Sequence, residues 1–501
     1  MIMNDQIRII INGKPRLAVK GIRLSELVSG DKPCGGHGKC GKCRITVKGN
    51  VSAPSEAELV QLTADELERG IRLSCMTCAT GDCEITTADL GGGERIITDS
   101  ATSEFSIAPD FSGYGIAVDV GTTTLAARLY SRNGSLLAEA ANMNPQGKWG
   151  ADVISRIEAA LSGKEAELAG AVRHAIDSLI CELADTARID SKEITLAVVT
   201  GNSVMLSLLT KESTEPFSHA PFVIKRPFGE TLKAGELDLD HLSPEASVYL
   251  PPCISAFVGA DTVCAILATD LCADKTAMLA DIGTNGEMAL WHGGKLTVCS
   301  TAAGPAFEGV GISMGMHGAK GAIDKVSVSG GNLQANVIGG GKPIGICGSG
   351  LVDAAACMLE LEIIDETGYL EDETVEIAPG VTLTQKDVRA LQLAKSAIYA
   401  GLMTLMTRGH VTPTDVSALH IAGGFGTYLN RTSAARIGLL PALLAERSVA
   451  VGNAALAGAS MILLNGGMQQ RAEEIARAAE TSELSTDPIF SEFFMSGMMF
   501  E

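Results

Sequence analysis

An internal repeat restricts the fold of this chain more than any other feature of its sequence. Residues 114–140 read YGIAVDVGTTTLAARLYSRNGSLLAEA, and residues 275–301 read KTAMLADIGTNGEMALWHGGKLTVCST. Each copy predicts a buried strand, a turn built on Asp-x-Gly-Thr, a second strand, a glycine hairpin and a third strand. The hairpins at Asn133-Gly134 and Gly293-Gly294 fall at matching offsets. Two copies in matching strand contexts indicate a duplicated structural unit.

The residue types in the two Asp-x-Gly-Thr loops suit a phosphate with a divalent cation. Asp119 and Asp281 can hold Mg²⁺ through its water shell, because this small cation keeps its waters and takes few carboxylates. Gly121 and Gly283 let the backbone approach a phosphate closely. Hydroxyls and successive backbone N–H groups then form a concavity that binds anions. The polar side chains of the two loops are Thr122, Thr123, Thr124, Thr284 and Asn285.

A third element resembles the loops in its use of glycine. In LHIAGGFGTYLN (419–430) an apolar strand, Leu419–Ala422, runs into Gly423, Gly424, Phe425 and Gly426. A glycine pair between a strand and a helix can pack flat against an adenosine ring or its α-phosphate. A plain tight turn is the alternative interpretation.

Four cysteines near the start of the chain make a second candidate site. Cys34, Cys40 and Cys43 stand in CGGHGKCGKC, and Cys75 follows in RLSCMTC. Plant-type [2Fe–2S] centres use nearly this pattern of three thiolates from one loop and a distant fourth. The first gap is one residue longer here, as in vertebrate-type ferredoxins. We predict a [2Fe–2S] cluster on these four cysteines, with a zinc site as the alternative and Cys78 as the alternative fourth ligand.

The segment around the cysteines reads as a small β-grasp domain. An Asn12-Gly13 turn separates two apolar runs and predicts a hairpin. Ser55 and Glu58 form a capping box that opens a helix, which we expect to continue through Leu67. The expected strands are Ile7–Ile11, Leu17–Val19, Arg44–Val47 and Cys83–Thr86. Residues 91–113, rich in Gly, Ser, Thr, Asp and Pro, are expected to form a linker.

Composition excludes some classes of function. The net charge is −20, which argues against nucleic acid as a partner, since binding to the phosphate backbone of a nucleic acid requires an excess of Lys and Arg. The 13 cysteines are odd in number and show no disulfide framework, and no apolar stretch is long enough to span a bilayer. We therefore expect a cytoplasmic protein. The apolar tail at 487–500 is expected to dock on the protein's own surface, with a homodimer or partner contact as the alternative.

The two phosphate loops and the adenosine glycines, in this order, resemble the ASKHA superfamily of acetate and sugar kinases, Hsp70 chaperones and actin. With a ferredoxin in front, the chain resembles the reductive activators of corrinoid proteins. These ATP-dependent proteins return cob(II)amide in a methyltransferase partner to cob(I)amide. The motifs that carry the resemblance are VDVGTTT (118–124), VTGNSVM (199–205), ADIGTNGE (280–287), STAAGPAFEG (300–309), CGSGLVD (347–353), LQLAKSAI (391–398), IAGGFG (421–426) and VGNAALAGA (451–459).

The resemblance implies roles for individual residues. Asp119, Asp281 and Thr123 are expected at the catalytic centre, with both aspartates near Mg²⁺. The helix LQLAKSAI implies that Lys395, with Gln392, contacts adenosine. The residues expected to bind the nucleotide are Gly121, Thr122, Thr124, Gly283, Thr284, Asn285, Gly348, Gly350, Lys395, Gly423, Gly424 and Gly426, of which Gly348 and Gly350 lie in a connecting segment beside a hinge.

The implied fold is α+β and multidomain: a β-grasp [2Fe–2S] ferredoxin at 1–90, a linker at 91–113, and a two-lobed ASKHA ATPase of the RNase H-like, actin/Hsp70 type. Its lobes are expected at 114–274 and 275–501. The implied activity is ATP-driven transfer of one electron from a low-potential donor, through the cluster, to a corrinoid protein. Alternatives are an electron injector for a 2-hydroxyacyl-CoA dehydratase-like enzyme, a small-molecule kinase, and a binding module in which ATP only switches conformation.

Overall fold

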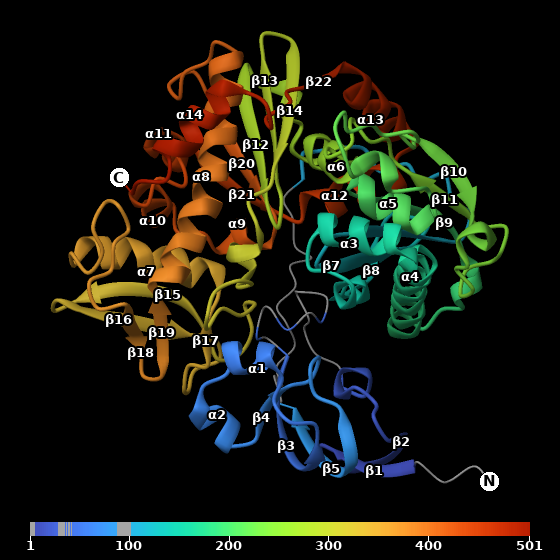
Figure 1. The fold of residues 1–501 in the computed structure, drawn as a ribbon. Helices are drawn as coiled ribbons and strands as arrows, with labels where there is room; N and C mark the ends of the chain where they lie inside the picture. Colours follow the sequence, from blue (N-terminus) through green and yellow to red (C-terminus); the bar gives the residue numbers. More distant parts are fainter. Residues whose placement is uncertain are drawn as a thin grey trace. The chain divides into compact units, whose positions relative to one another are not determined.

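A computed structural model of the chain describes residues 6–28, 36, 38, 41, 43–87 and 102–500. The chain forms two compact units (Figure 1). The first contains the N-terminal residues together with Pro145–Ala159, which includes helix α3 (Val153–Ala159). The second contains the remaining residues, including both copies of the repeat. No helix in the described part of the chain is long and apolar enough to cross a membrane.

The N-terminal unit is built on a five-stranded sheet in the order β2-β1-β5-β3-β4. Strand β1 pairs antiparallel with β2 and parallel with β5, and β3 pairs antiparallel with both β5 and β4. The predicted hairpin turn is confirmed, with φ of 48° at Asn12 and 79° at Gly13. The strands are β1 (Gln6–Ile11), β2 (Lys14–Val19), β3 (Arg44–Val51), β4 (Ile71–Leu73) and β5 (Ala79–Thr87).

The predicted capping box is present, but the helix that it opens is shorter than expected. Ser55 caps α1 (Glu56–Gln61), and its hydroxyl and backbone N–H both bond to the Glu58 carboxylate. Leu62 then adopts an extended conformation, which ends the helix. A separate helix, α2 (Ala64–Glu68), follows, because Thr63 and Glu66 form a second set of capping hydrogen bonds.

The second unit contains two six-stranded sheets (Figure 1) that share the topology of five strands and differ in the position of the sixth, an edge strand. In the first sheet, β6, β7 and β8 form an antiparallel meander, and β9 and β11 extend it in parallel from β6. The order is β10-β11-β9-β6-β7-β8. The strands are β6 (Tyr114–Val120), β7 (Thr124–Tyr130), β8 (Leu136–Met143), β9 (Ile194–Gly201), β10 (Glu230–Lys233) and β11 (Ser247–Leu250).

The second sheet repeats this arrangement with the second copy of the sequence repeat. Strands β12, β13 and β14 form the meander, and β20 and β21 extend it in parallel from β12. The duplication predicted from the sequence is therefore confirmed in the strand pairing. The strands are β12 (Thr276–Ile282), β13 (Gly286–His292), β14 (Lys295–Thr301), β20 (Ala418–Ala422), β21 (Ser448–Gly452) and the edge strand β22 (Ala479–Thr481).

Two helices join the halves of this unit. Helix α6 (Ala260–Thr269) follows the first sheet and packs along α12 (Ala454–Leu464), which follows β21 of the second sheet and also contacts β6 and β9. The two helices approach closely because Gly458 has no side chain: a Cβ there would lie 2.0 Å from the Cys264 carbonyl oxygen. The apolar cluster around them contains residues from both sheets, including Val198, Leu279 and Val298.

A smaller sheet is inserted between β14 and β20. Its strands are β15 (Ala322–Ser329), β16 (Asn332–Val337) and β17 (Gly345–Ile346), and a hairpin of β18 (Thr374–Ala378) and β19 (Val381–Thr384) follows. Helix α7 (Gly348–Glu360) packs on β15.

The other α-helices of this unit are α4 (Glu165–Ala187), α5 (Ser203–Thr210), α8 (Gln385–Arg408), α9 (Gly424–Tyr428), α10 (Arg431–Arg436), α11 (Ala442–Glu446), α13 (Gly466–Ala478) and α14 (Pro488–Ser496).

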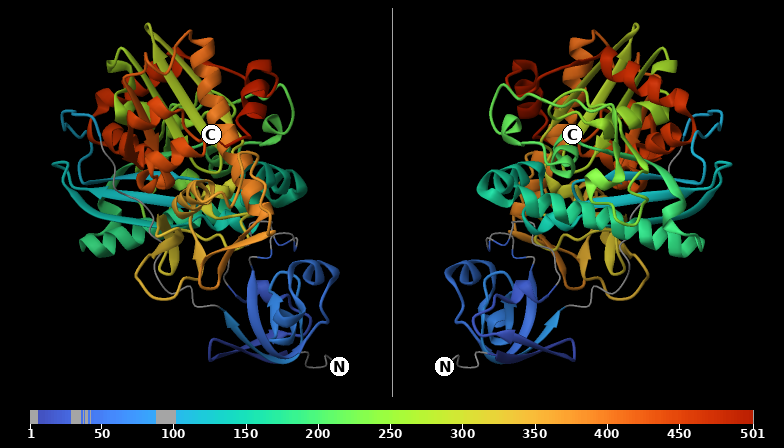
Figure 2. Two further views of the ribbon diagram at one scale, coloured as in Figure 1. Left: turned by 90° about the vertical axis from the view of Figure 1, so that its left-hand side faces the viewer. Right: turned by 90° about the vertical axis from the view of Figure 1, so that its right-hand side faces the viewer.

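The C-terminal tail docks on the protein's own surface, as predicted. Helix α14 lies along α8 (Figure 2). A two-pronged ion pair between Arg408 and Asp487, with distances of 2.9 to 3.0 Å, fixes the start of the tail. Phe500 is buried at its end. The aromatic residues of the tail therefore pack on α8.

The described part of the predicted linker belongs to the second unit and is packed within it. The Ser103 N–H donates to the Ala268 carbonyl and the Ala108 N–H to the Leu464 carbonyl, at 2.9 and 2.8 Å. Phe111 is buried in the apolar cluster that surrounds α6 and α12. Its aromatic side chain explains why this stretch is packed, since a free linker would expose it to water.

Candidate functional site

A cavity of about 300 Å³ in the second unit is lined by both copies of the repeat. The loop after β6 supplies one wall and the loop after β12 another, because the parallel strands of each sheet end there. The predicted residues that the structure brings together around this cavity are Asp119, Gly121, Thr122, Thr123, Thr124, Asp281, Gly283, Thr284, Asn285, Gly348, Gly423 and Gly424.

Hydrogen bonds from neighbouring elements fix the first loop. The Asn144 amide donates to the Gly121 carbonyl at 2.8 Å, and the Asn202 amide donates to the Thr122 hydroxyl at 3.0 Å. Asn202 also caps helix α5 by accepting from the Met205 N–H. The loop is therefore held by side chains that sequence reasoning did not assign.

Four half-buried residues with carboxyl groups line the cavity: Asp119, Asp261, Asp281 and Glu287. Burial, with a smaller contribution from neighbouring charges, raises the pKa of Asp119 and that of Asp281 to about 7. Burial also raises the pKa of Asp261 to about 6, and burial with the charges of Asp261 and Asp281 raises the pKa of Glu287 well above its usual range. Carboxylates packed this closely favour a bound cation.

The donor set suits Mg²⁺ better than a cation that needs a full protein cage. Among the described residues, no three His, Cys, Asp or Glu side chains are arranged to hold a metal ion by themselves. Mg²⁺ is usually bound by one or two carboxylates, with water and phosphate oxygens completing its shell. Asp119 and Asp281 fit that requirement.

Two of the acidic residues were not predicted, although the sequence contains signals for both. Asp261 stands in Val258-Gly259-Ala260-Asp261 at the start of α6, and the matching helix α12 begins after Val451-Gly452-Asn453. Glu287 lies two residues beyond Asn285 and pairs with Asp281 across β12 and β13. Extending the repeat beyond its first three strands would have matched the helix start that carries Asp261 to the helix start that Asn453 caps.

A single carboxylate bridges the two phosphate loops. Glu308 accepts a hydrogen bond of 2.8 Å from the Thr123 hydroxyl on one oxygen and one of 2.9 Å from the Thr284 hydroxyl on the other. Glu308 belongs to a short helix, Pro305–Glu308, that lines the same cavity. The sequence analysis included it in a motif but gave it no role.

Two glycines after β20, Gly423 and Gly424, also line the cavity. Gly423 has φ of 88°, and a Cβ there would lie 2.9 Å from an Asp281 carboxylate oxygen, so the position requires glycine. The ring of Phe425, in the next turn, stacks on that of Phe307 with centroids 4.5 Å apart. Gly426 does not line the cavity, because it packs against Ile421, where a Cβ would lie 2.5 Å from a side-chain carbon.

Lys395 and Gly350 depart from their expected positions. Lys395 is fully buried on α8, where its ammonium donates to the Met499 carbonyl and lies 5.0 Å from the centre of the Phe500 ring. Gln392 likewise donates to the Met498 carbonyl, at 2.7 Å. The docked tail therefore covers both side chains and keeps them from the cavity. Gly350 packs on β15, where a Cβ would lie 2.2 Å from the Ile323 carbonyl.

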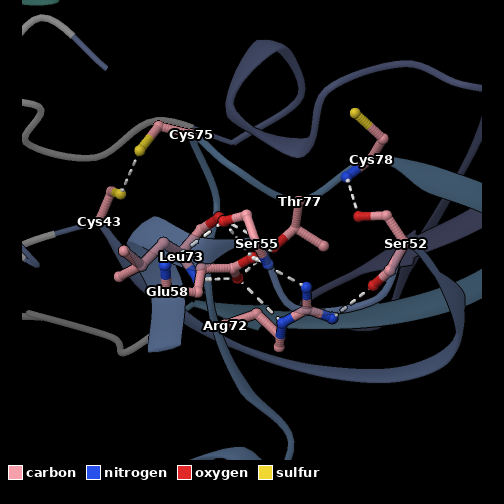
Figure 3. A network of polar contacts seen from close by, with 9 residues as sticks. All are labelled: Cys43, Ser52, Ser55, Glu58, Arg72, Leu73, Cys75, Thr77 and Cys78. Atoms are coloured by element: carbon pink, nitrogen blue, oxygen red, sulfur yellow. Dashed lines mark hydrogen bonds and ion pairs between the residues drawn. The ribbon is translucent and has the colours of Figure 1, made fainter. Parts of the chain in front are cut away.

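In the N-terminal unit, the structure brings together the two described members of the predicted cysteine set. Cys43 and Cys75 are both buried, and their sulfur atoms lie 3.1 Å apart (Figure 3). Cys34 and Cys40 lie outside the described residues. Cys78 lies apart from this pair in Figure 3, and its backbone N–H donates to the Ser52 hydroxyl at 3.1 Å.

A buried ion pair fixes the segment that carries Cys75. The Glu58 carboxylate accepts two hydrogen bonds from the Arg72 guanidinium, at 2.9 and 3.0 Å, and others from the Leu73 N–H and the Thr77 hydroxyl. These partners lie on both sides of Cys75 in the chain. The network therefore holds the backbone that carries Cys75 (Figure 3).

Comparisons with known proteins place the chain in a family. A family model described as the C-terminal domain of RACo, the ASKHA domain, matches residues 275–501, and one described as the RACo middle region matches 114–274. The chain is 36% identical over 418 residues to the corrinoid activation enzyme RamQ of Eubacterium limosum, covering 77% of this chain and 70% of that protein. The chain belongs to the RACo family of corrinoid-protein activators. It is therefore an enzyme.

Two other relatives agree with the family assignment. A [Co(II) methylated amine-specific corrinoid protein] reductase of Methanosarcina barkeri is 26% identical over 415 residues, or 76% of each chain. The solved structure of a reductive activator for corrinoid,iron-sulfur protein has a TM-score of 0.72 and 27% identity, covering 99% of this chain and 98% of that one. The α+β ASKHA fold implied by the resemblance is confirmed.

Proposed function

We propose that this enzyme reductively activates a corrinoid protein at the expense of ATP, transferring one electron to cob(II)amide to regenerate cob(I)amide for methyl transfer. The observation that carries the proposal is the cavity in which both phosphate loops of a RACo-family chain meet the glycines after β20. Its lining combines hydroxyls, glycine backbone and carboxyl groups, which supports binding of a nucleotide with a divalent cation. The domain boundaries given above, at 90, 113 and 274, belong to the same proposal.

In this proposal, ATP binds with its phosphates between the loops of the two repeats and its base near Gly423 and Gly424. Asp119 and Asp281 hold Mg²⁺, which neutralises phosphate charge. Thr122, Thr123 and Thr284 donate their hydroxyls to phosphate oxygens. The raised pKa values of both aspartates favour this role, because a cation that binds them stabilises the ionised form which burial disfavours.

We further propose that the N-terminal unit is a β-grasp domain that holds a [2Fe–2S] cluster on Cys34, Cys40, Cys43 and Cys75. Two buried sulfur atoms 3.1 Å apart support the inclusion of Cys43 and Cys75, because thiolates at that separation can bind one iron. A bound cluster would supply the electron. The strand order and the parallel β1–β5 pair are consistent with this fold.

The ligand assignment has a direct test in the full-length protein. We expect Cys75→Ser to abolish or alter the visible absorbance and electron paramagnetic resonance of the cluster, and Cys78→Ser to leave both unchanged. Iron and sulfide analysis checks the cluster type. A protein that holds zinc without sulfide, or a Cys78→Ser variant that loses the signal, would contradict the assignment.

ATP has a thermodynamic role in this proposal. A plant-type [2Fe–2S] centre has a potential near about −400 mV. We expect Co(II) in a corrinoid to be harder to reduce than that, and for one electron each ~59 mV costs about 1.4 kcal/mol. ATP can drive the step only if the nucleotide changes how strongly the enzyme binds the two states of its partner or changes access to cobalt.

The deciding experiment follows cob(I)amide absorbance with a purified corrinoid protein, a low-potential electron donor and ATP. We expect reduction with the wild-type enzyme and ATP, and much less without ATP or with Asp281→Ala. Equal reduction in all three reactions would contradict the proposal. The corrinoid partner is best chosen by screening proteins of methyltransferase systems for an ATP-dependent signal.

A further inference from the structure

We propose that Glu308 is a latch that occupies the phosphate position of the nucleotide-free enzyme and is displaced by the β- and γ-phosphates of ATP. The inference rests on the proposed function, since it assumes that ATP binds in this cavity. It adds a residue that sets the affinity for the nucleotide and distinguishes ATP from AMP.

The Glu308 carboxylate bridges the two loops through the same hydroxyls that a phosphate group would use. One oxygen of the Glu308 carboxylate accepts from Thr123 in the first repeat, and the other accepts from Thr284 in the second repeat. Threonine hydroxyls of such loops are the donors that a phosphate would use. A hydroxyl has one proton to donate, so neither threonine can donate to Glu308 and to a phosphate at the same time.

Electrostatic repulsion also disfavours the presence of the Glu308 carboxylate and a phosphate at these two hydroxyls at the same time. The cavity already holds Asp119, Asp261, Asp281 and Glu287. A carboxylate at the same hydroxyls as a phosphate would add direct repulsion between like charges at short range. Binding of the terminal phosphates therefore requires the Glu308 side chain to leave the two hydroxyls.

The surroundings allow the side chain to leave while its backbone stays in place. The Pro305–Glu308 helix is held by the stacking of Phe307 on Phe425. Its backbone also packs closely against Gly348, where a Cβ would lie 2.0 Å from the Phe307 carbonyl oxygen. The Glu308 side chain itself is only partly buried. Rotation about its side-chain bonds would release both hydroxyls without moving the helix.

Calorimetric titration of the full-length protein with Mg²⁺-ATP and with AMP tests the latch. We expect Glu308→Ala to bind ATP about tenfold more tightly than the wild type, a change of about 1.4 kcal/mol. Glu308→Gln should show a smaller gain, because its single carbonyl oxygen bridges less well and carries no charge. Binding of AMP, which lacks the β- and γ-phosphates, should stay within about twofold of the wild type in both variants.

A matched control is Glu371→Gln, which removes a negative charge from an exposed residue that does not line the cavity. It should leave both affinities unchanged. The latch is overturned if both Glu308 variants bind ATP as the wild type does or more weakly, since the carboxylate would then serve the bound nucleotide. It is also overturned if ATP and AMP tighten equally. A wild type that binds no nucleotide would instead overturn the proposed function.

Discussion

The side-chain amide of Asn453 donates a hydrogen bond of 2.9 Å to the carboxylate of Asp119, although 334 positions separate the two residues in the sequence. Asn453 also caps α12 by accepting from the Leu456 N–H at 2.8 Å. Because α12 follows the second sheet and packs on the first, this bond ties a helix start of the second repeat to the phosphate loop of the first.

The first prediction concerns this bond. Replacing Asn453 with Ala removes a hydrogen bond that lowers the pKa of Asp119, which burial has raised to about 7. The pKa should therefore rise further, so that a larger share of Asp119 is protonated near neutral pH. We expect weaker Mg²⁺-ATP binding at pH 7 that recovers at higher pH. Titrations across this range check the shift.

Asn430→Ala is the control for the loss of a helix cap, which typically costs about 1 kcal/mol. Asn430 caps α10 by accepting from the Thr432 N–H and does not line the cavity. Its variant should lose a similar amount of stability and keep the wild-type pH dependence. Identical pH profiles for all three proteins would show that the contact with Asp119 does not tune its ionisation.

Sequence reasoning predicted many of the residues that line the cavity, because each loop follows a buried strand with its own local signal. Asp119, Thr123, Asp281 and Thr284 all line the cavity for that reason. Asp261 was missed because it comes from the start of a helix and not from either Asp-x-Gly-Thr loop. Its place in the cavity depends on the packing of α6.

The surroundings of Lys395, in contrast, could not be predicted from the sequence. A lysine on a helix has no sequence signal that tells whether solvent, a nucleotide or another part of the chain lies opposite. Here the tail covers it, and the contact spans 104 positions. The tail itself was correctly predicted to dock, because its apolar side chains favour burial, but the surface that receives it depends on tertiary packing.

The second prediction concerns the acidic cluster in the absence of Mg²⁺ and nucleotide. Burial raises the pKa of Asp261 to about 6, above its ordinary value of 3.8. The folded state therefore binds more protons than the unfolded state between these values, and the free energy of unfolding falls as pH rises through the window. Asp261→Asn removes this penalty and relieves Asp119, Asp281 and Glu287 of a repelling charge.

We expect Asp261→Asn to be more stable than the wild type by about 2 kcal/mol near pH 8 and by much less near pH 4. Hydrogen exchange of peptides from α6, measured in a chelating buffer, reports this local stability. The Thr262 N–H, which donates to Asp261 at 2.7 Å, keeps an acceptor in the variant. A variant that is less stable than the wild type near pH 8 would argue that the charge is already compensated in the free protein.

The third prediction concerns the ion pair near Cys75. Burial raises the pKa of Glu58, but hydrogen bonds outweigh it, that from Arg72 most strongly, and the net effect lowers the pKa below 4.5. The stabilisation is thus present above about pH 4.5 and is lost as pH falls through the lowered pKa. Glu58→Ala leaves a buried guanidinium unpaired, which should cost about 3–5 kcal/mol.

Hydrogen exchange of peptides from residues 55–79 of the full-length protein measures this cost. The comparison variant is Glu66→Ala, which breaks the more exposed pair with Arg44 and the capping hydrogen bond from Thr63, and should cost about 1–2 kcal/mol. Similar protection in both variants would mean that the buried pair contributes no more than an exposed one. Protection in the wild type should also decrease below about pH 4.5, and the Glu58→Ala variant should lack this dependence.

The fourth prediction concerns the contact between α6 and α12. A methyl group at position 458 would lie 2.0 Å from the Cys264 carbonyl, which is backbone and cannot turn aside, so Gly458→Ala must push the helices apart. We expect a loss of about 1–3 kcal/mol in stability and weaker ATP binding, because Asp261 lies in the first turn of α6 and Asn453 caps α12. Gly170→Ala on α4, where a Cβ meets nothing within 4 Å, should instead stabilise its helix by about 0.5–1 kcal/mol. Calorimetric titration and thermal unfolding of both variants separate these outcomes. If Gly458→Ala loses stability but binds ATP as the wild type does, the spacing of the two helices does not control the site.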